Sequence, residues 1–357
     1  MNPSNFPGFD DREDDFSTSD EELQNYLEQL RVKIMIFGAG GAGSNTINRL
    51  MKEGINGATM IACNTDAPHL LKTKANHKIL MGKTLTRGLG SGADPRVGEQ
   101  AARESDQEIM KYITGTDIAF ITAGLGGGTG TGSAPYIASR AKDSGALTIS
   151  VVTLPFKSEG KVRMENATQG LSRLSNFSDT VIIIPNDKLL ELVPDLPLEK
   201  AFRFADEIIV KAITGISDLV TKPGLINLDF NDLKTIVKDS GLAMIGIGMS
   251  SAEPGMRVEE AVQKAMNSPF LKFDMSNSSG VIINITGGSD LQLEESSSAA
   301  EIIRKQVGKS TQIIWGATVD PKYTGSVEVL VVATGLSYSE IQGMNNKPDN
   351  DNGIDMI

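Results

Sequence analysis

Apolar and polar positions alternate in blocks along most of this chain, with short apolar runs separated by longer amphipathic segments. The runs predict strands at Val32 to Phe37, Thr59 to Asn64, Asp117 to Ala123, Ala146 to Leu154 and Asp179 to Pro185. Helical periodicity occupies the segments between them. Strands that alternate with helices are typical of a parallel sheet covered by helices. The first part of the chain is therefore expected to form a Rossmann-like α/β domain.

The pattern changes at Leu198 to Val220, where apolar residues recur on more than one side of a helix and predict a long, buried central helix. From Leu242 the order strand, helix, strand, helix, strand, strand predicts a four-stranded sheet covered by two helices. Those helices are expected at Arg257 to Asn267 and Glu294 to Val307. The predicted architecture is a parallel-sheet domain joined by a long central helix to a smaller α+β domain.

The two ends of the chain differ in composition from the middle. The first twenty residues are rich in Asp, Asn, Pro and Ser, which predicts disorder, and an acidic amphipathic helix is expected from Asp20 to Leu30. We therefore expect four parts. They are an acidic, partly disordered extension over 1–30, a first domain with the central helix over 31–220, a smaller domain over 221–336 and a disordered tail over 337–357.

The net charge of −11 is a property of these ends. Residues 1–30 carry nine acidic side chains against Arg12, and residues 336–357 carry four against Lys347, which leaves 32 acidic and 32 basic residues between them. The folded body is therefore neutral. Because binding to the phosphate backbone of nucleic acids depends on a basic surface, no nucleic-acid partner is expected.

The apolar runs are too short for a membrane protein. None approaches the roughly twenty residues that span a bilayer, and the N-terminus lacks the basic and apolar regions of a secretion signal. We therefore expect a cytoplasmic protein without direct membrane insertion. The single Cys63 excludes an internal disulfide, and having only two histidines, His69 and His77, excludes a His-rich metal site.

The strongest candidate for chemistry is the stretch Gly124 to Pro135, which reads GLGGGTGTGSAP. It follows a predicted strand and precedes a helix expected to begin near Ser133. Backbone N–H groups can approach an anion closely where side chains are missing, and the helix N-terminus adds unpaired donors and positive potential. Thr129 and Thr131 supply hydroxyl groups that a flexible linker does not need. The stretch therefore predicts a polyphosphate-binding loop.

A second glycine-rich loop, GAGGAGSN, follows the first predicted strand and precedes a helix at Thr46 to Glu53. Gly38, Gly40 and Gly43 fit the dinucleotide pattern G-x-G-x-x-G, and Asp66 stands where the ribose-binding acid of such a unit stands. Taken alone, this motif favours a nicotinamide or flavin oxidoreductase. Two phosphate loops on one sheet instead favour a single nucleotide held from both sides, which leaves the oxidoreductase as the weakest alternative.

Two further polar segments are expected at the same edge of the sheet. Gly82 to Ala102 is polar and glycine-rich and is followed by a helix through about Tyr112, which predicts a loop folded over the nucleotide face. Asn186 and Asp187 directly follow a buried strand. Because the carboxyl ends of parallel strands meet at one edge, these residues are expected near the glycine loops.

Two pairs of charged residues have ordinary structural interpretations. Glu159 and Arg163 are four apart at the start of a helix, where spacing alone favours an exposed ion pair. Asp229 and Asp232 are three apart just before an apolar helix, where spacing alone favours N-terminal capping. Spacing therefore assigns neither pair to a functional site.

Taken together, the motifs resemble the tubulin/FtsZ superfamily and, within it, the archaeal branch of the FtsZ family of cell-division GTPases. The resemblance rests on FGAGGAGSN, NTDA, LTRGLGSGADP, GLGGGTGTGSAP, FKSEGKVRM, IIIPNDKLL, TKPGLINLDFNDL and IIWGA. These occur in the family order between about Val32 and Leu336, so only the two tails fall outside it. The resemblance implies the tubulin/FtsZ fold, with a GTP-binding domain over 31–220 and a catalytic acidic loop near the start of the part over 221–336.

The resemblance also implies roles around the nucleotide. Both glycine loops would contact the phosphates, through Gly41, Ala42, Gly43, Ser44, Asn45, Gly127, Gly128, Thr129, Gly130 and Thr131. Glu159 and Arg163 would reach the ribose and phosphates. Asn186 and Asp206 would hydrogen-bond guanine, and Phe202 would pack on its ring. Position 206 is usually Asn or Asp in the family, and Asp206 can accept from guanine N1 and N2.

A shared active site is implied as well. Asn227, Asp229 and Asp232 would complete the catalytic site of the next subunit, with the carboxylates polarising a water molecule near the γ-phosphorus. A bound Mg²⁺ would neutralise phosphate charge, although its ligands are not assigned. Hydrolysis would then require a head-to-tail contact between copies of the chain. Such a contact does not close on itself and propagates as a protofilament.

The function implied is a GTPase, activated by polymerisation, that forms the cell-division ring at midcell. The alternative is a GTP-binding scaffold of the same superfamily that controls cell shape. The apolar GIDMI end follows a polar segment and predicts contact with a membrane-anchoring or division partner. A frayed tail fits the same pattern equally well.

Overall fold

The computed structural model describes residues 31–55, 57–192, 197–222, 228–271 and 275–336. The part of the chain from Val32 onward is one compact unit. The N-terminal extension with its predicted helix, the tail with its GIDMI end, and Asn227 lie outside the described residues. Predictions for those segments stay predictions.

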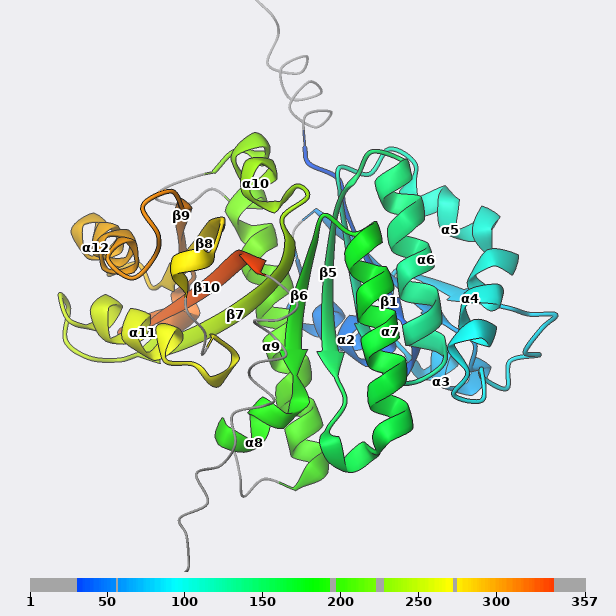
Figure 1. Ribbon diagram of the computed structural model, residues 1–357. Coiled ribbons are helices and arrows are strands. Elements are labelled where there is room, and N and C mark those ends of the chain that lie inside the picture. The colour runs from blue at the N-terminus through cyan, green and yellow to red at the C-terminus, as the bar shows by residue number, and fades with distance from the viewer. Residues whose placement is uncertain (1–30, 56, 193–196, 223–227, 272–274, 337–357) are drawn as a thin grey trace, which may run out of the picture. The chain divides into compact units, whose positions relative to one another are not determined.

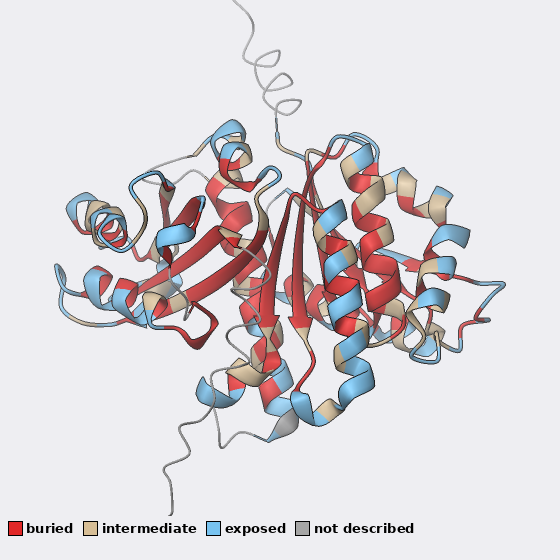
Figure 2. Cartoon of the chain, viewed as in Figure 1, coloured by how far each residue is buried: buried red, intermediate tan, exposed pale blue. Residues whose placement is uncertain are grey.

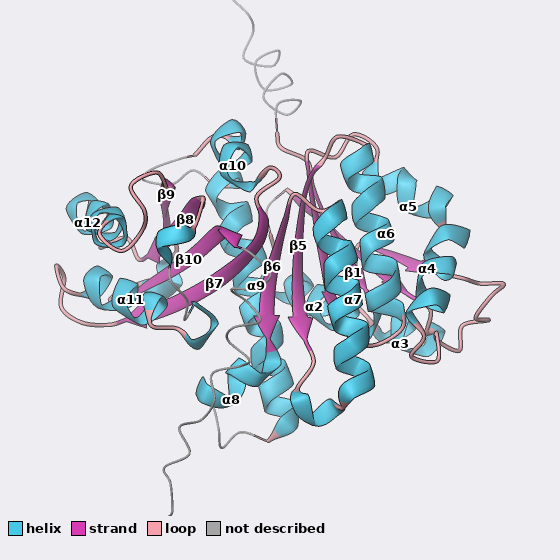
Figure 3. Ribbon diagram, in the orientation of Figure 1, coloured by secondary structure: helices cyan, strands magenta, loops and turns pink. Residues whose placement is uncertain are grey.

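Ten strands of the described part form one sheet in the order β3-β2-β1-β4-β5-β6-β7-β10-β8-β9 (Figures 1 and 3). They are β1 Ile34–Ala39, β2 Ala58–Asn64, β3 His77–Leu80, β4 Ile118–Gly124, β5 Leu147–Leu154, β6 Thr180–Pro185, β7 Gly241–Ser250, β8 Gly280–Gly287, β9 Gln312–Val319 and β10 Val327–Leu336. Strands β1 to β6 pair in parallel. Only β3 among them is missing from the predicted strands, because a single residue of it, Ile79, is buried.

Helices cover both faces of this sheet (Figure 2). They are α2 Gly40–Glu53, α3 Ala67–Lys72, α4 Pro95–Glu104, α5 Asp106–Ile113, α6 Thr129–Asp143, α7 Lys161–Phe177, α8 Leu189–Leu192, α9 Leu198–Thr221, α10 Phe230–Val237, α11 Arg257–Met266 and α12 Leu293–Arg304. One buried cluster includes residues of α4 to α7, α11 and α12, and the other includes residues of α2, α3, α9 and α10. The sheet therefore lies between two apolar cores.

Alternate residues of each parallel strand enter the two cores. In β1, Phe37 and Ala39 belong to the first core, whereas Ile34 and Ile36 belong to the second. Burial on both faces explains why the strands read as nearly continuous apolar runs in the sequence. Polar and glycine-rich residues are consequently found where the strands end, which places the functional site at an edge of the sheet.

The predicted central helix is present as α9, which ends at Thr221, one residue later than expected. Ile209, Ala212, Ile213 and Ile216 are buried in the second core. The helix contacts β5 and β6 as well as β8, β9 and β10. It therefore packs against both parts of the sheet. No described helix, α9 included, is both long and apolar enough to cross a membrane.

Strands β7 to β10 are the predicted four-stranded group. β10 pairs antiparallel with β7 and with β8, and β8 pairs parallel with β9. β7 also pairs with β6, over Thr180 to Ile182, so this group continues the parallel sheet instead of standing apart from it. The predicted fold class is therefore confirmed, with the addition that one sheet runs through both of its parts.

Two predicted glycine loops are shorter than expected because helices begin inside them. α6 begins at Thr129 instead of near Ser133, and α2 begins at Gly40 instead of Thr46. Neither helix start has a side-chain cap, so the usual signal of a helix start is missing from the sequence. Much of each loop is the first turn of a helix.

The predicted loop from Gly82 to Ala102 also contains a helix start. Asp94 accepts a hydrogen bond from the backbone N–H of Arg96 at 2.9 Å, and Pro95 is the first residue of α4. An Asp cap followed by proline is a recognised helix start, so the sequence did carry this signal. The helix expected to run to Tyr112 is two helices, α4 and α5, separated at Ser105.

Candidate functional site

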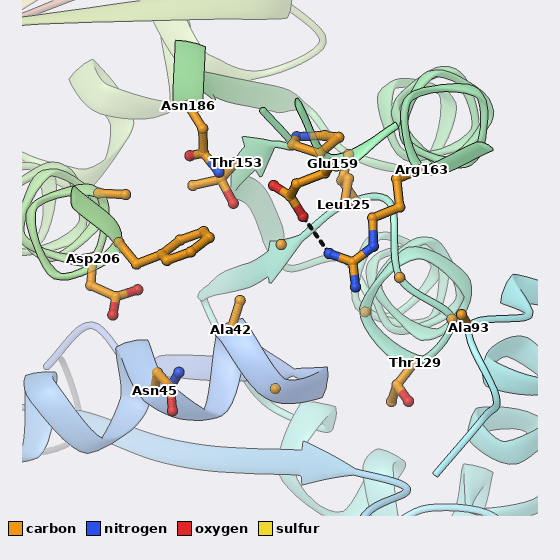
Figure 4. A pocket seen from close by; sticks show the side chains of 18 of the residues that line it. Ala42, Asn45, Ala93, Leu125, Thr129, Thr153, Glu159, Arg163, Asn186 and Asp206 are labelled. Atoms are coloured by element: carbon orange, nitrogen blue, oxygen red, sulfur yellow. Dashed lines mark hydrogen bonds and ion pairs between the residues drawn. The ribbon is translucent and has the colours of Figure 1, made fainter. Parts of the chain in front are cut away.

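A pocket of about 540 Å³ lies at the carboxyl edge of the parallel strands (Figure 4). Its walls come from the ends of β4 and β5, the segment after β6, the starts of α2 and α6, and one side of α9. The residues predicted to bind the nucleotide all line this pocket, except Gly43, Ser44 and Thr131. Segments far apart in the sequence are thus brought together where the strand pattern predicts.

Two helices begin at the pocket, α2 after β1 and α6 after β4, and these two strands are neighbours in the sheet. The first backbone N–H groups of a helix have no acceptor within the helix, and the helix dipole is positive at this end. Neither helix has an acidic residue in its first turn. Two such ends at one pocket favour a ligand with several negative charges, such as a polyphosphate.

The two helix starts approach each other at Gly40. Gly40 has a φ of +73°, and a Cβ atom there would lie 2.7 Å from the backbone nitrogen of Gly130. Both the backbone conformation and the space therefore require glycine. This close approach lets two sets of backbone donors act on one anion.

The hydroxyl group of Thr129 joins three segments. It lies 2.7 Å from the hydroxyl of Thr65, which follows β2, and 2.9 Å from that of Ser91. Ser91 and Ala93 belong to the predicted loop over the nucleotide face, and both line the pocket. Thr129 therefore fixes this loop against the start of α6.

Gly43, Ser44 and Thr131, the three predicted residues that do not line the pocket, are buried beside it. Thr131 Oγ1 accepts a hydrogen bond from the backbone N–H of Gly126 at 2.8 Å, and this bond shapes the glycine loop. A Cβ atom on Gly43 would lie 2.5 Å from the carbonyl oxygen of Thr122, and Ser44 is fully buried. None of the three lines the pocket, and Thr131 supports the glycine loop from behind.

Glu159 and Arg163 form the ion pair that their spacing predicts, and both also line the pocket (Figure 4). Glu159 Oε1 accepts a hydrogen bond from the backbone N–H of Phe156 at 2.9 Å, which holds the carboxylate near the start of α7. An arginine has five N–H donors and one carboxylate does not use them all. The ion pair therefore leaves Arg163 able to donate to a ligand oxygen.

Asn186 and Asp206 lie at the end of the pocket opposite Thr129 (Figure 4), and Phe202 also lines the pocket. Asn186 is buried, and its Oδ1 has no hydrogen-bond partner among the described residues. Phe202 is 40% exposed and packs edge-on against Phe156, with ring centroids 5.4 Å apart. An exposed ring near the Asn186 amide and the Asp206 carboxylate suits a planar base that carries N–H donors.

Burial raises the pKa of Asp206 to about 6, and the opposing effects of Arg49 and of a hydrogen bond with Thr46 are smaller. Arg49 is itself held by Glu207 and by the carbonyl oxygen of Arg203, each at 2.8 Å. The carboxylate of Asp206 is therefore poorly compensated, and a ligand that donates hydrogen bonds to it would stabilise its charged form.

The two predicted catalytic carboxylates do not line the pocket. Asp229 Oδ1 accepts from the backbone N–H of Asp232 at 2.8 Å, and Asp232 Oδ2 accepts from that of Asp229 at 3.4 Å. This is a capping box at the start of α10. The capping interpretation made from spacing is therefore confirmed. Asn227, the third predicted catalytic residue, lies outside the described part.

Helix α10 lies at the end of the parallel strands opposite the pocket (Figure 1). Thr180, the first residue of β6, donates to the carbonyl oxygen of Val237 at the end of α10 at 2.6 Å. Asn186, which lines the pocket, directly follows the last residue of β6. Six residues of strand span about 20 Å. Asp229 and Asp232 therefore cannot reach a ligand in the pocket of their own chain.

Thr153 and Pro155 are the pocket residues that lie outside the predicted site set, the predicted loops and the predicted central helix. They lie at the end of β5, which pairs with β4 and β6. Predicted site residues follow both of those neighbours, so the strand order was the signal that could have found them. Asp66, expected as the ribose acid of a dinucleotide-binding unit, instead caps α3 by accepting from the backbone N–H of His69 at 2.9 Å. This placement argues against the oxidoreductase.

Comparison with known protein families gives two matches that together cover most of the chain. Residues 33–194 match the tubulin/FtsZ family GTPase domain, and residues 241–337 match the FtsZ family C-terminal domain. Cell division protein FtsZ 1 of Pyrococcus abyssi is 52% identical over 93% of this chain and 89% of its own length. The protein of the same name from Archaeoglobus fulgidus is 49% identical over 98% of this chain and 93% of its own.

Comparison with solved structures also matches this chain to FtsZ. The structure described as an empty FtsZ dimer from M. jannaschii superposes with a TM-score of 0.85 at 52% identity, covering 88% of this chain and 92% of that one. CetZ1 from Haloferax volcanii, a GDP-bound monomer, gives 0.76 at 20% identity, covering 88% and 97%. At 20% identity, the similarity to CetZ1 shows only that the two proteins share a fold.

Proposed function

Because the chain belongs to the FtsZ family, whose first domain is the GTPase domain shared with tubulin, we propose that it is a self-polymerising GTPase of cell division. The proposal includes an active site that a neighbouring copy completes. The observation that carries it is the placement of the pocket and the carboxylates of Asp229 and Asp232 at opposite ends of one sheet.

In the proposed binding mode, the phosphates lie between the starts of α2 and α6, and the base lies between Asn186, Phe202 and Asp206. Guanine presents donors at N1 and N2. The unpaired Oδ1 of Asn186 and the Asp206 carboxylate are both acceptors. Adenine presents an acceptor at N1 and no amino group at C2, so in the same orientation it would not donate to these oxygens, which supports selectivity for GTP.

The carboxylates that line the pocket already have roles in this arrangement. Glu159 pairs with Arg163, and Asp206 faces the base. We therefore assign the activation of water to other carboxylates. Among the described residues, the capping box engages one oxygen of Asp229 and one of Asp232. In the proposed mechanism their second oxygens orient a water molecule against the γ-phosphate of a neighbour.

A contact between unlike ends of two chains is heterologous and repeats without closing. Each added copy would place its α10 over the pocket of the copy below it. The proposal therefore joins catalysis to filament growth, because only a pocket that has been covered is complete. The M. jannaschii structure described as an FtsZ dimer supports self-assembly in the family.

We include Mg²⁺ in the proposal, carried with the nucleotide. The described residues contain no group of three or more His, Cys, Asp or Glu side chains that could hold a metal ion. Mg²⁺ commonly keeps several water ligands and binds through substrate phosphates with few protein ligands, and the hydroxyls of Ser91 and Thr129 beside the phosphate end fit that mode. The ion would neutralise phosphate charge.

The concentration dependence of GTP hydrolysis tests the proposal. If a neighbouring chain completes the site, the rate of phosphate release per molecule rises steeply with protein concentration at saturating GTP. A rate per molecule that stays constant from dilute to concentrated protein would contradict the shared site while leaving GTP binding in place.

A division role is proposed over a cell-shape role because the relatives at 52% and 49% identity are named for cell division, whereas CetZ1 at 20% identity shares the fold alone. The tagged protein is expected at midcell in dividing cells. We also propose that the C-terminal end binds a membrane-anchoring or division partner. Deleting residues 345–357 is expected to abolish midcell placement with GTPase activity intact, and normal placement would refute that contact.

A further inference from the structure

The two histidines of the chain have different surroundings. His77 in β3 stacks on Tyr112, with ring centroids 4.6 Å apart, and does not line the pocket. His69 in α3 lies between two asparagine side chains. Its Nδ1 is 3.0 Å from Asn64 Nδ2, and its Nε2 is 3.2 Å from Asn45 Oδ1. Because Asn45 lines the pocket, His69 is one side chain away from the proposed nucleotide.

The backbone fixes the direction of the Asn64 amide. Asn64 is buried, and its Oδ1 accepts from the backbone N–H groups of Thr65 at 2.8 Å and Asp66 at 3.3 Å. Its Nδ2 therefore faces His69, and an amide nitrogen can only donate, so Nδ1 of His69 must accept. A neutral imidazole that accepts at Nδ1 carries its hydrogen at Nε2.

The Nε2–H group of His69 therefore donates to Asn45 Oδ1 and decides which way that amide points. Figure 4 shows the nitrogen of Asn45 turned toward the pocket and the oxygen turned away from it. With the amide reversed, Asn45 Nδ2 would face the Nε2–H of His69, donor against donor. Phosphate and ribose oxygens accept hydrogen bonds, so the orientation present is the one that suits a nucleotide.

We propose that His69 is a positioning residue for nucleotide binding, which holds Asn45 as a hydrogen-bond donor toward an oxygen of bound GTP. The inference rests on the proposed function, because it requires a nucleotide in this pocket. His69 does not line the pocket itself and acts through Asn45. The relay from Asn64 through His69 to Asn45 connects the end of β2, helix α3 and helix α2.

Affinity for GDP, which is not hydrolysed, gives the first test. We expect His69→Leu to weaken GDP binding to the full chain about tenfold in isothermal titration, in line with the loss of one oriented hydrogen bond. The amide nitrogen of glutamine can donate from a position similar to Nε2, so His69→Gln is expected to stay within about threefold of the wild type. Turnover at saturating GTP should change little, because the change affects binding.

A double-mutant cycle separates positioning from a general structural effect. In the Asn45→Ala background, His69→Leu is expected to cause no further loss of GDP affinity, because the side chain through which it acts is gone. His77→Leu is the matched control and is expected to leave affinity unchanged. An equal loss from His69→Leu in both backgrounds would overturn the positioning role.

The tautomer can be read without any variant. In the wild-type chain labelled with ¹⁵N-histidine, only His69 and His77 report, and His69 is expected to carry its hydrogen at Nε2. A hydrogen at Nδ1 would overturn the inference even if His69→Leu failed to fold. If the wild-type chain bound neither GDP nor GTP, the proposed function would fail; if it bound GDP and His69→Leu bound equally well, only this inference would fail.

Discussion

The two ends of the parallel strands are built differently. At the carboxyl edge, α2 and α6 begin without side-chain caps or first-turn acids, which leaves backbone donors for a ligand. At the opposite end, α10 begins with a capping box in which Asp229 and Asp232 each accept from the other's backbone N–H. At one end the two helix starts have no acidic residue in their first turns, and at the other the carboxylates of Asp229 and Asp232 do not reach the pocket of their own chain. This difference is the basis of the proposal that the ends of two chains complement each other.

The largest expected effect comes from removing a carboxylate at the α10 end. We predict that Asp232→Ala lowers GTP turnover by about 10²-fold or more, the usual contribution of a group that activates the attacking water. GTP affinity should not change, because Asp232 does not line the pocket. Phosphate release at saturating GTP, with binding measured in parallel, checks both statements.

The matched control for that variant is Asp320→Ala. Asp320 also caps a helical turn, accepting from the backbone N–H of Lys322 at 3.0 Å, but it lies far from α10 in the sequence and is not proposed to act in catalysis. It should keep normal turnover. Turnover in Asp232→Ala within about threefold of this control would break the proposed complementarity of the two ends.

The pocket end should respond to pH through Asp206. Burial raises its pKa to about 6 in the free protein, and hydrogen bonds from guanine favour the charged form. GTP affinity should therefore fall as pH drops through 6, by about tenfold between pH 7 and pH 5, because the protonated group must first lose its proton. Titrations across this range provide the measurement.

Asp206→Asn should bind GTP more weakly at about pH 7 and lose most of this pH dependence. The stability of the fold depends on pH through Asp206 in the opposite direction to that of most carboxylates. Because the folded-state pKa is raised, the contribution of Asp206 to stability is present at low pH and is lost as pH rises through about 6. A pH dependence that survives in Asp206→Asn would assign it to another group.

A smaller effect is expected from the Thr129 hydroxyl, which holds the loop between β3 and α4 against the start of α6. Thr129→Val removes the contacts with Thr65 and Ser91 and should weaken GTP binding about five- to tenfold. Thr114→Val, which removes an exposed hydroxyl bonded to the carbonyl oxygen of Met110, is the control. Equal affinities in the two variants would show that this tie does not shape the pocket.

The smallest expected effect is on stability and comes from the cap at Asp229. Asp229→Ala should lower the free energy of unfolding by about 1 kcal/mol, the usual effect of losing an N-cap. Serine caps nearly as well, so Asp229→Ser should retain that stability and still lose GTP turnover. Thermal unfolding and phosphate release give the two readouts. Normal turnover in Asp229→Ser would leave this residue with capping alone.

The strands were predictable because burial on both faces imposes apolar runs, as in β1. The starts of α2 and α6 were not, because the residues that usually mark a helix start are missing where a ligand is expected. The capping of α10 could be predicted from the spacing of Asp229 and Asp232. The distance of Asp229 and Asp232 from the pocket could not be predicted from their spacing. It depends on the length of β6, which separates Thr180 from Asn186.

A mixing experiment tests the shared site most directly. One partner is Asp232→Ala, which keeps its pocket, and the other combines Asn186→Ala with Asp206→Ala, which damages the guanine end of the pocket but keeps both carboxylates. Each variant alone should hydrolyse GTP poorly, and the mixture should recover a substantial part of wild-type turnover, because the second chain supplies its carboxylates to the pocket of the first. A mixture no more active than the sum of its parts would contradict the account.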